Sequence, residues 1–532
     1  MHGRSWYAVV LIVALGVWFI LGAANLYYGE LNQDEGWYLY TARLTAEGLQ
    51  PYRDYAFTQG PVFAHVYALA NPFVERYGLM GGRLFTGLLG LVSIALSGWL
   101  AWRLIPGPGA RSAAALAVIL LSCNVYHSYF SIVVKTYSLS ALLLVAGALC
   151  LTGMHTQAGR KAALFAGLFF ALAAGVRLSA GIWLPIVGLY LLLHRHDWQK
   201  AWLSFGTGGL VGLLIAFGPS FVNSAEATWF WLVQYHTARE AGTGLDVWIY
   251  KAGFLSRFVQ AYFVSVLMLL VLVIVPFTMR QRPACPKPMG VLWLGVAAST
   301  LIHVAAPFPY EDYQVILMPI LSALIASGLV GLVQMLAPNA HQRAVKHAVV
   351  VFVLLASIAA AFSSPMNQAW VLRERDRIWW RLKETSDLGL LQETARWLNE
   401  QQGDGEMLLT QDTYLAVETG MTVPRGLEMG PFSYYPDWSR EQAERRNVLN
   451  REMLIELLET TDAQWAAFSG YGLAIRSPDI TELASEEQAE LRAIVERRYE
   501  PVKTVPHFGQ AHTDLEILRL RNPAPDALNP EP

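Results

Sequence analysis

The 532-residue sequence has few of the residues on which disulfide-rich, zinc-binding and nucleic-acid-binding proteins depend. It contains only three cysteines, and none lies within residues 363–532, so no disulfide framework is expected in that part. No Cys/His spacing indicates a zinc site. Charged residues make up 15% of the chain, and no basic stripe suited to nucleic acid occurs in residues 363–532. We therefore expect no nucleic-acid partner.

The apolar residues that are present indicate an integral membrane protein. Hydrophobic residues account for 54% of the chain, which also has 18 tryptophans. Residues 1–360 hold 21 Lys/Arg and 12 Asp/Glu, whereas residues 363–532 hold 18 and 29. The net charge of −2 conceals this difference. The sequence thus predicts a transmembrane domain over residues 1–362 and an acidic, water-soluble domain over residues 363–532.

The first part contains eleven apolar runs, each predicted to be a membrane-spanning helix. They lie at about residues 6–28, 80–104, 110–130, 136–153, 162–176, 178–193, 201–222, 259–279, 290–306, 313–336 and 346–362. With a cytoplasmic N-terminus, every inner loop has at least two basic residues, as the positive-inside rule requires. Eleven of the twelve acids before residue 360 then lie on the outer side. Eleven spans also place the C-terminal domain outside.

The C-terminal part has alternating helix-like and strand-like segments. Helices are predicted at about 387–401, 440–460 and 485–496, and strands at 406–410, 464–468, 498–505 and 514–520. This alternation is typical of a small α/β domain. The Gly/Pro-rich segment 420–437 is aromatic, and such a loop either stacks on sugars or packs as a cap over the membrane domain.

Two adjacent acids, Asp34 and Glu35, follow the first apolar run. A carboxylate pair at a membrane surface is more often functional than decorative, although it could also cap the next helix. The outer segment 29–82 is long and is predicted to hold an amphipathic helix at 36–47 and an apolar helix ending near residue 76. Helices of this kind suit a protein that takes a lipid-linked ligand from the bilayer, and the alternative is a packing loop.

Further polar residues occur where apolar sequence predominates. Arg83, Lys135 and Arg177 lie near the predicted outer face, where a cation exposed to lipid would cost about 2.5–3.5 kcal/mol at the bilayer centre. A bound phosphate would offset that cost, whereas snorkelling to the headgroups is the alternative. His303 precedes a short outer loop with Tyr310 and Asp312. These residues could bind sugar hydroxyls, or the loop could merely cap a helix.

The chain resembles the GT-C glycosyltransferases, in particular the group that contains the lipid A aminoarabinose transferases, protein mannosyltransferases and rhizobial galacturonosyltransferases. The likeness covers most of residues 1–340. It is carried by the sequences Asp34-Glu35-Gly36-Trp37-Tyr38, Tyr52-Arg53-Asp54, Thr58-Gln59-Gly60-Pro61 and Arg83-Leu84. It implies an inverting transferase that uses a polyprenyl-phosphate sugar donor.

The resemblance assigns roles to the residues. Asp34 would accept the proton of the attacking acceptor, and Glu35 would orient the acceptor or support Asp34. The expected substrate-binding residues are Arg53, Asp54, Gln59, Arg83, Lys135, Arg177, His303, Tyr310 and Asp312. Among them, the three cations Arg83, Lys135 and Arg177 would hold the departing lipid phosphate.

Two positions depart from the family pattern. Relatives such as the aminoarabinose transferases have Lys before Pro in the first loop, where this chain has Gln59-Gly60-Pro61. Phosphate binding would then depend on other cations, such as Arg53 or Lys135. Several relatives also have an acid where this chain has Lys135, so no metal is predicted.

The resulting hypothesis is a multi-pass enzyme of the bacterial inner membrane, with its N-terminus in the cytoplasm and its C-terminal domain in the periplasm. Its partners would be a lipid-linked sugar donor, an envelope acceptor and membrane lipids. A polytopic transporter or a flippase for an anionic or glycosylated lipid is the main alternative. Such proteins usually show repeated halves, which we do not find here. A non-catalytic scaffold of the envelope is a third alternative.

Overall fold

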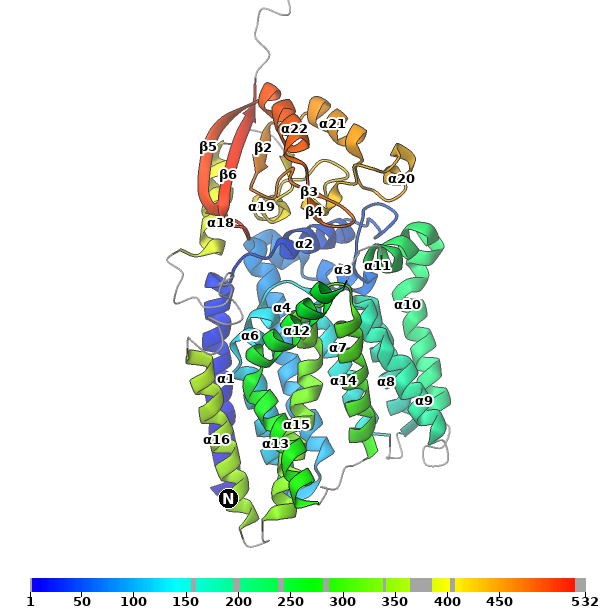
Figure 1. Ribbon diagram of the computed structural model, residues 1–532, viewed down its shortest axis with the longest axis vertical. Coiled ribbons are helices and arrows are strands. Elements are labelled where there is room, and N and C mark those ends of the chain that lie inside the picture. Colours follow the sequence, from blue (N-terminus) through cyan, green and yellow to red (C-terminus); the bar gives the residue numbers. More distant parts are fainter. Residues whose placement is uncertain are drawn as a thin grey trace, which may run out of the picture.

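The computed structural model describes the chain in eight stretches. These are residues 2–154, 159–194, 201–237, 244–280, 287–337, 341–363, 385–401 and 407–521. A bundle of long helices forms one part of the molecule, and a smaller domain with a β-sheet lies on one end of it (Figure 1). The N-terminal end of helix α1 lies at the opposite end of the bundle. The predicted boundary at residue 363 adjoins residues 364–384, outside the described ones, so the exact division stays a prediction.

The bundle agrees with the apolar pattern of the sequence. Within the eight described stretches, seven helices are long and apolar enough to cross a membrane, two bent helix pairs meet the same test, and two shorter apolar helices accompany them. Each of the eleven predicted runs falls on one of these segments. The chain is thus a multi-pass membrane protein, although the number of spans stays a prediction.

The elements of this part have the following bounds: α1 (His2–Tyr28), α4 (Asn71–Leu104), η1 (Gly107–Gly109), α5 (Ala110–Ser122), α6 (Val125–Ile132), α7 (Thr136–Thr152), α8 (Gly159–Val176), η2 (Leu178–Ile182), α9 (Trp183–Leu193), α10 (Ala201–Trp229), η3 (Phe230–Gln234), α11 (Tyr235–Thr237), α12 (Leu245–Ala261), α13 (Phe263–Met279), α14 (Lys287–Ala305), η4 (Glu311–Leu317), α15 (Met318–Leu336) and α16 (Gln342–Phe362).

Two of the predicted straight spans are bent. Helices α5 and α6 meet at 73°, and α12 and α13 meet at 96°. Asn124 causes the first break, because its side-chain oxygen caps the new helix by accepting a hydrogen bond from His127 N at 2.7 Å. Its amide nitrogen donates to Ala261 O at the second break, at 2.9 Å. A single side chain therefore joins the two bends.

The first outer segment forms two short helices, α2 (Gln33–Ala46) and α3 (Pro61–Ala68). Helix α3 ends earlier than predicted, because α4 begins at Asn71 and bends at Gly78. Gly78 has φ +58°, and a β-carbon there would lie 2.1 Å from Glu418 Oε2, so this position requires glycine. The same carboxylate oxygen accepts from Leu79 N at 2.8 Å. The kink thus provides a contact with the C-terminal domain.

The C-terminal domain has the predicted α/β character. Its four-stranded sheet has the order β1-β2-β6-β5, with β1 and β2 parallel and the other pairs antiparallel. The elements are α18 (Asp387–Gln401), β1 (Leu408–Thr410), α19 (Thr413–Thr419), η6 (Gly430–Ser433), α20 (Arg440–Glu444), α21 (Arg451–Thr460), β2 (Trp465–Phe468), β3 (Ile475–Arg476), β4 (Thr481–Glu482), α22 (Ser485–Arg498), β5 (Tyr499–Phe508) and β6 (Thr513–Leu520). The helix predicted over 440–460 is divided into α20 and α21, because Asn450 caps a new helix by accepting from Met453 N.

Helix α2 lies between the bundle and this domain rather than on an open membrane surface (Figure 1). Gly36 permits the close approach, since a β-carbon there would lie 2.3 Å from Tyr414 N of α19. Tyr40 Oη accepts from Val423 N at 2.9 Å, and Arg43 donates to Met421 O at 3.0 Å. The domain is therefore fixed to the helix that carries Asp34.

Glu428 is a buried carboxyl of the C-terminal domain, and its titration should make the stability of the protein depend on pH. Burial raises its pKa from 4.5 to about 7. The folded protein then binds more protons than the unfolded chain between pH 4.5 and 7, so this carboxyl lowers stability as the pH rises through that range. We expect Glu428→Gln to raise the free energy of unfolding at pH 8 by up to about 3 kcal/mol, with the gain shrinking toward pH 5.

Thermal denaturation in detergent at pH 5 and pH 8 measures this effect. Glu500→Gln, at an exposed position of β5, is the matched control and should show no pH-dependent gain. If Glu428→Gln changed the melting temperature by the same amount at both pH values, the proposed titration would be contradicted.

Candidate functional site

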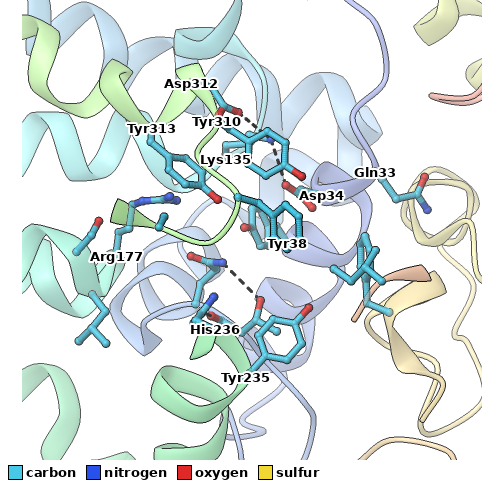
Figure 2. Close-up of a pocket in the computed structure, with 18 of the residues that line it drawn as sticks. Gln33, Asp34, Tyr38, Lys135, Arg177, Tyr235, His236, Tyr310, Asp312 and Tyr313 are labelled. Atoms are coloured by element: carbon cyan, nitrogen blue, oxygen red, sulfur yellow. Dashed lines mark hydrogen bonds and ion pairs between the residues drawn. The ribbon is translucent and has the colours of Figure 1, made fainter. Parts of the chain in front are cut away.

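A cavity of about 670 Å³ lies where the helix bundle meets the C-terminal domain. Its walls come from α2, the segment around Gly60, the starts of α7 and η2, the elements η3 and α11, the segment 302–313 and loops of the C-terminal domain. Of the predicted site residues, seven line this cavity: Asp34, Gln59, Lys135, Arg177, His303, Tyr310 and Asp312. Residues from distant parts of the sequence are therefore brought together (Figure 2).

Asp34 lies in the first turn of α2 and faces the cavity. The side chain of Asn32 caps this helix by accepting from Asp34 N at 3.1 Å. Trp37 Nε1 donates to Asp34 Oδ1 at 3.3 Å, which fixes the carboxylate from one side. The Asp34 side chain retains 28% of its exposure. It is thus positioned by its neighbours and still accessible to a substrate.

Lys135 lies between two carboxylates. Its Nζ atom is 3.2 Å from Asp34 Oδ2 and 3.5 Å from Asp312 Oδ2 (Figure 2). The Lys135 and Asp312 side chains are 10% and 11% exposed, so this arrangement is largely shielded from water. Asp312 Oδ1 is buried and has no hydrogen-bond partner within the described stretches. This oxygen is available to a ligand hydroxyl.

Arg177 is the second cation of the cavity. Its guanidinium carbon lies 4.3 Å from the Tyr313 ring centroid and 5.3 Å from that of Tyr137. Nη1 donates to Thr136 Oγ1 at 3.4 Å. Among the residues that the structure describes, no carboxylate forms an ion pair with Arg177, and its buried Nε lacks a hydrogen-bond partner. Arg177 can therefore bind an incoming anion.

Several lining residues were not identified from the sequence. Tyr38, Tyr137, Tyr313 and Tyr235 surround the charged groups, and His236 Nε2 lies 2.8 Å from Thr58 O. Tyr235 and His236 directly follow η3, a π-helical turn after α10. Such turns are frequent at functional sites, but the sequence has no clear signal for one. Aromatic residues are also common in cores, so they did not stand out.

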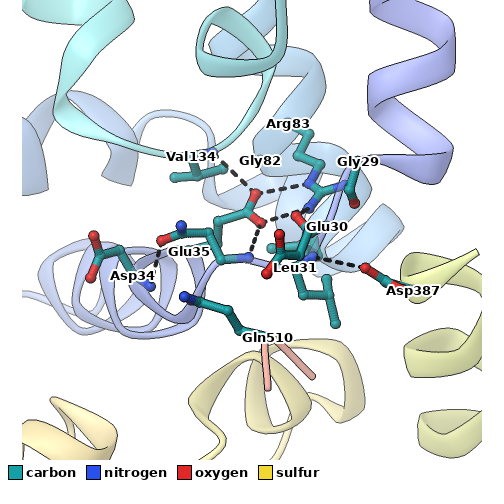
Figure 3. A network of polar contacts seen from close by, with 12 residues as sticks. Gly29, Glu30, Leu31, Asp34, Glu35, Gly82, Arg83, Val134, Asp387 and Gln510 are labelled. Carbon is teal, nitrogen blue, oxygen red and sulfur yellow. Dashed lines mark hydrogen bonds and ion pairs between the residues drawn. The ribbon is translucent and has the colours of Figure 1, made fainter. Parts of the chain in front are cut away.

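Glu35 lies outside the cavity, in an ion pair with Arg83 (Figure 3). Arg83 Nη2 is 2.6 Å from Glu35 Oε2 and Nε is 2.8 Å from Oε1, with both side chains fully buried. Arg83 also donates to the carbonyl oxygens of Leu26, Gly29 and Glu30. Because Arg83 donates to these carbonyl oxygens as well as to Glu35, its guanidinium is bound within the protein.

The same carboxylate connects α2 to the segment that carries Lys135. Asn32 N donates to Glu35 Oε2 at 3.0 Å and completes a capping box. Val134 N donates to Glu35 Oε1 at 3.1 Å. Glu35 therefore fixes the backbone beside Asp34 and beside Lys135, which is a positioning role.

Arg53 and Asp54 also lie outside the cavity lining. They pair with each other at 2.7 Å, with side-chain exposures of 48% and 23%. The hydrogen bonds from Arg53 lower the pKa of Asp54. Asp54 Oδ2 also accepts from Gln50 N at 2.7 Å, which closes the local turn. The structure thus places four predicted site residues, Glu35, Arg53, Asp54 and Arg83, away from the cavity.

The described residues that the C-terminal domain contributes to the cavity wall carry no charged side chain. They are Met429, Pro431, Phe432, Tyr471, Ile475, Ile480 and Gln510. Gln510 also accepts from Gln33 N at 2.7 Å, next to Asp34. Part of the predicted aromatic segment 420–437 is buried, with Tyr434 and Tyr435 in the domain core, whereas Phe432 reaches the cavity. The segment therefore packs as a cap and also lines the site.

No protein-family model and no curated protein matches the chain. Solved structures do. ArnT from Cupriavidus metallidurans bound to undecaprenyl phosphate is 15% identical, with a TM-score of 0.63 over 97% of this chain and 98% of that one. The oligosaccharyltransferase AglB from Archaeoglobus fulgidus, in complex with an inhibitory peptide and a dolichol-phosphate, is 11% identical, with a TM-score of 0.52 over 88% and 70%. A complex of the Archaeoglobus fulgidus oligosaccharyltransferase with zinc and sulfate is 13% identical, with a TM-score of 0.50 over 93% and 72%. At identities this low, the structural matches establish a shared fold.

Proposed function

We propose that this chain, which has the GT-C fold of ArnT and AglB, is an inverting glycosyltransferase that uses a polyprenyl-phosphate sugar donor. The observation that carries the proposal is the cavity in which an accessible carboxylate, Asp34, lies with Arg177, a cation that has no ion-pair partner in the described part of the chain. Inversion requires a base for the acceptor and a cation for the leaving phosphate. ArnT with undecaprenyl phosphate and AglB with dolichol-phosphate support a lipid phosphate as the anion.

The proposed reaction is a single displacement at the anomeric carbon of the sugar. A hydroxyl oxygen of the acceptor attacks this carbon, and the hydroxyl loses its proton to Asp34. The bond between the anomeric carbon and the phosphate oxygen breaks, and the lipid phosphate leaves with the electron pair. Arg177 stabilises the negative charge that develops on this phosphate. Positioning both reactants in one cavity supplies a large part of the rate enhancement.

The remaining lining residues fit sugar recognition. Asp312 Oδ1 can accept a bond from a sugar hydroxyl, and Tyr310 and His303 lie on the same wall. His303 is held by Gln314, whose Nε2 is 3.1 Å from Nδ1. Gln59 also lines the cavity. We assign substrate contacts to these four residues.

We place the protein in the bacterial inner membrane, with the N-terminus in the cytoplasm and the C-terminal domain in the periplasm. The distribution of basic residues supports this orientation. The acceptor would then be an envelope lipid, glycan or protein.

A turnover assay tests the proposal. The purified protein is reconstituted with the lipid-linked sugar fraction of bacterial membranes and an envelope extract as acceptor. Mass spectrometry should detect loss of the polyprenyl-phosphate sugar and release of free polyprenyl phosphate. Transfer of the intact lipid between leaflets without cleavage would instead indicate a flippase and would contradict the enzymatic assignment.

The Arg177→Gln variant should bind lipid phosphate more weakly. Loss of a hydrogen bond to a charged group, worth about 1.5–3 kcal/mol, predicts a roughly 10- to 100-fold higher Kd for undecaprenyl phosphate. Tryptophan fluorescence in nanodiscs measures this change. Arg53→Gln, an exposed arginine outside the cavity, is the control and should leave the Kd unchanged. Equal weakening by both substitutions would contradict a specific role for Arg177.

A further inference from the structure

The fold relative solved with zinc and sulfate raises the question of whether the present cavity can hold a divalent ion. Within the described stretches, no group of three or more His, Cys, Asp or Glu side chains is arranged to bind a metal. Asp34 and Asp312 both line the cavity, and both contact the Lys135 ammonium. A divalent ion between them would meet a like charge, so these residues do not fit a metal.

We propose that the Lys135 ammonium is the built-in cation of the site, occupying the place between two carboxylates that a divalent metal would otherwise take. The inference rests on the proposed transferase function and implies that the reaction proceeds without a divalent metal. Lys135 is then a positioning residue, because it acts on the orientation of Asp34 and Asp312. Arg177 remains the cation for the donor phosphate.

The surroundings of Lys135 suit a fixed internal charge. The residue has extended backbone angles of φ −140° and ψ 169° and directly precedes α7. The preceding residue is anchored through Val134 N to the buried Glu35. The ammonium also lies 5.6 Å from the Tyr137 ring centroid and 5.8 Å from that of Phe130. Backbone, carboxylates and rings thus hold it in one place.

Charge counting supports this role. Among the residues that the structure describes, the cavity lining has two acids, Asp34 and Asp312, and two permanent cations, Lys135 and Arg177. Without Lys135, the two carboxylates would repel each other in a largely shielded site. Oxygen ligands of this kind attract Mn²⁺ and Mg²⁺. Removal of the ammonium should therefore create an affinity for divalent ions that the natural chain lacks.

The test compares the wild type with Lys135→Met, which keeps an unbranched side chain but removes the charge. Turnover is measured with excess EDTA and with millimolar MnCl₂. The wild type should be equally active in both conditions. Lys135→Met should lose roughly 10²-fold in EDTA, the scale reported for removing one stabilising group from an active site, and should recover at least part of this loss with Mn²⁺.

Binding of Mn²⁺, followed by its electron paramagnetic resonance signal, gives a readout that does not require activity. Lys135→Met should bind one Mn²⁺ that neither the wild type nor Lys135→Met/Asp312→Asn binds. Lys135→Arg keeps the positive charge and should neither bind Mn²⁺ nor require it, which separates loss of charge from loss of folding.

Two results would overturn the inference. One is a wild type whose turnover disappears in EDTA and returns with Mn²⁺. The other is a folded Lys135→Met protein that binds no Mn²⁺. If the wild type shows no transferase activity at all, the proposed function fails, whereas the Mn²⁺ measurements still decide the role of Lys135.

Discussion

Replacement of Asp34 by Asn should lower turnover by roughly 10³-fold while leaving binding of the lipid donor within a factor of a few, because general-base catalysis contributes about 10²–10⁴-fold. The amide keeps the shape of the side chain and can still contact Trp37 and Lys135, but it cannot accept the acceptor's proton. Steady-state turnover and the Kd for undecaprenyl phosphate, measured on the same preparation, separate chemistry from binding.

Asp54→Asn is the matched control for this experiment. Asp54 belongs to the same outer segment and is also an acid, but it pairs with Arg53 outside the cavity. Its variant should keep its turnover within a factor of two or so, as expected for a surface substitution. Full activity of Asp34→Asn, or an equal loss in both variants, would refute Asp34 as the base.

The Arg83→Met variant should show the largest loss of stability. Arg83 and Glu35 are both 0% exposed, and removal of one partner leaves the other charge buried without compensation. Such losses cost about 3–5 kcal/mol in the free energy of unfolding. The variant should also release the carbonyl oxygens that Arg83 binds near the end of α1. Thermal denaturation in detergent measures the loss.

Two further variants separate charge burial from lost packing. Glu35→Gln/Arg83→Met removes both charges and should be more stable than Arg83→Met alone, because no uncompensated charge remains buried. Arg53→Met disrupts an exposed pair and should leave the melting temperature nearly unchanged. A double variant that is less stable than Arg83→Met would show that packing, rather than the unpaired carboxylate, dominates.

Much of the fold follows from the sequence, because long apolar helices leave a strong local pattern. All eleven apolar runs fall on helices or bent helix pairs, and the predicted strands at 464–468 and 514–520 correspond to β2 and β6. The bends were not predicted, since they depend on one cap at Asn124 and on its contact with Ala261. The packing of α19 against α2 was not predicted, because it requires a distant segment to approach Gly36.

The site was predictable to the extent that charge within apolar sequence is rare. Asp34, Lys135 and Arg177 stood out for that reason, and the structure brings them to one cavity. Arg83 stood out equally, yet it is bound to Glu35, from which it is separated by 48 residues in the sequence. A sequence indicates that a buried charge needs a partner, but it does not say whether the partner is a ligand or another side chain. Tyr38 and Tyr313 were not identified as site residues, because aromatic residues, unlike charged ones, are common within apolar sequence.

The uncharged wall that the C-terminal domain adds to the cavity has a consequence for how the specificity of such a protein can evolve. Among the described lining residues, the acids and permanent cations lie between positions 34 and 312, whereas residues such as Phe432, Ile475 and Ile480 come from the C-terminal domain. Substitutions there would reshape the cavity without disturbing the balance of charge around Asp34. We therefore expect substrate preference to diverge among related proteins faster than the reaction itself.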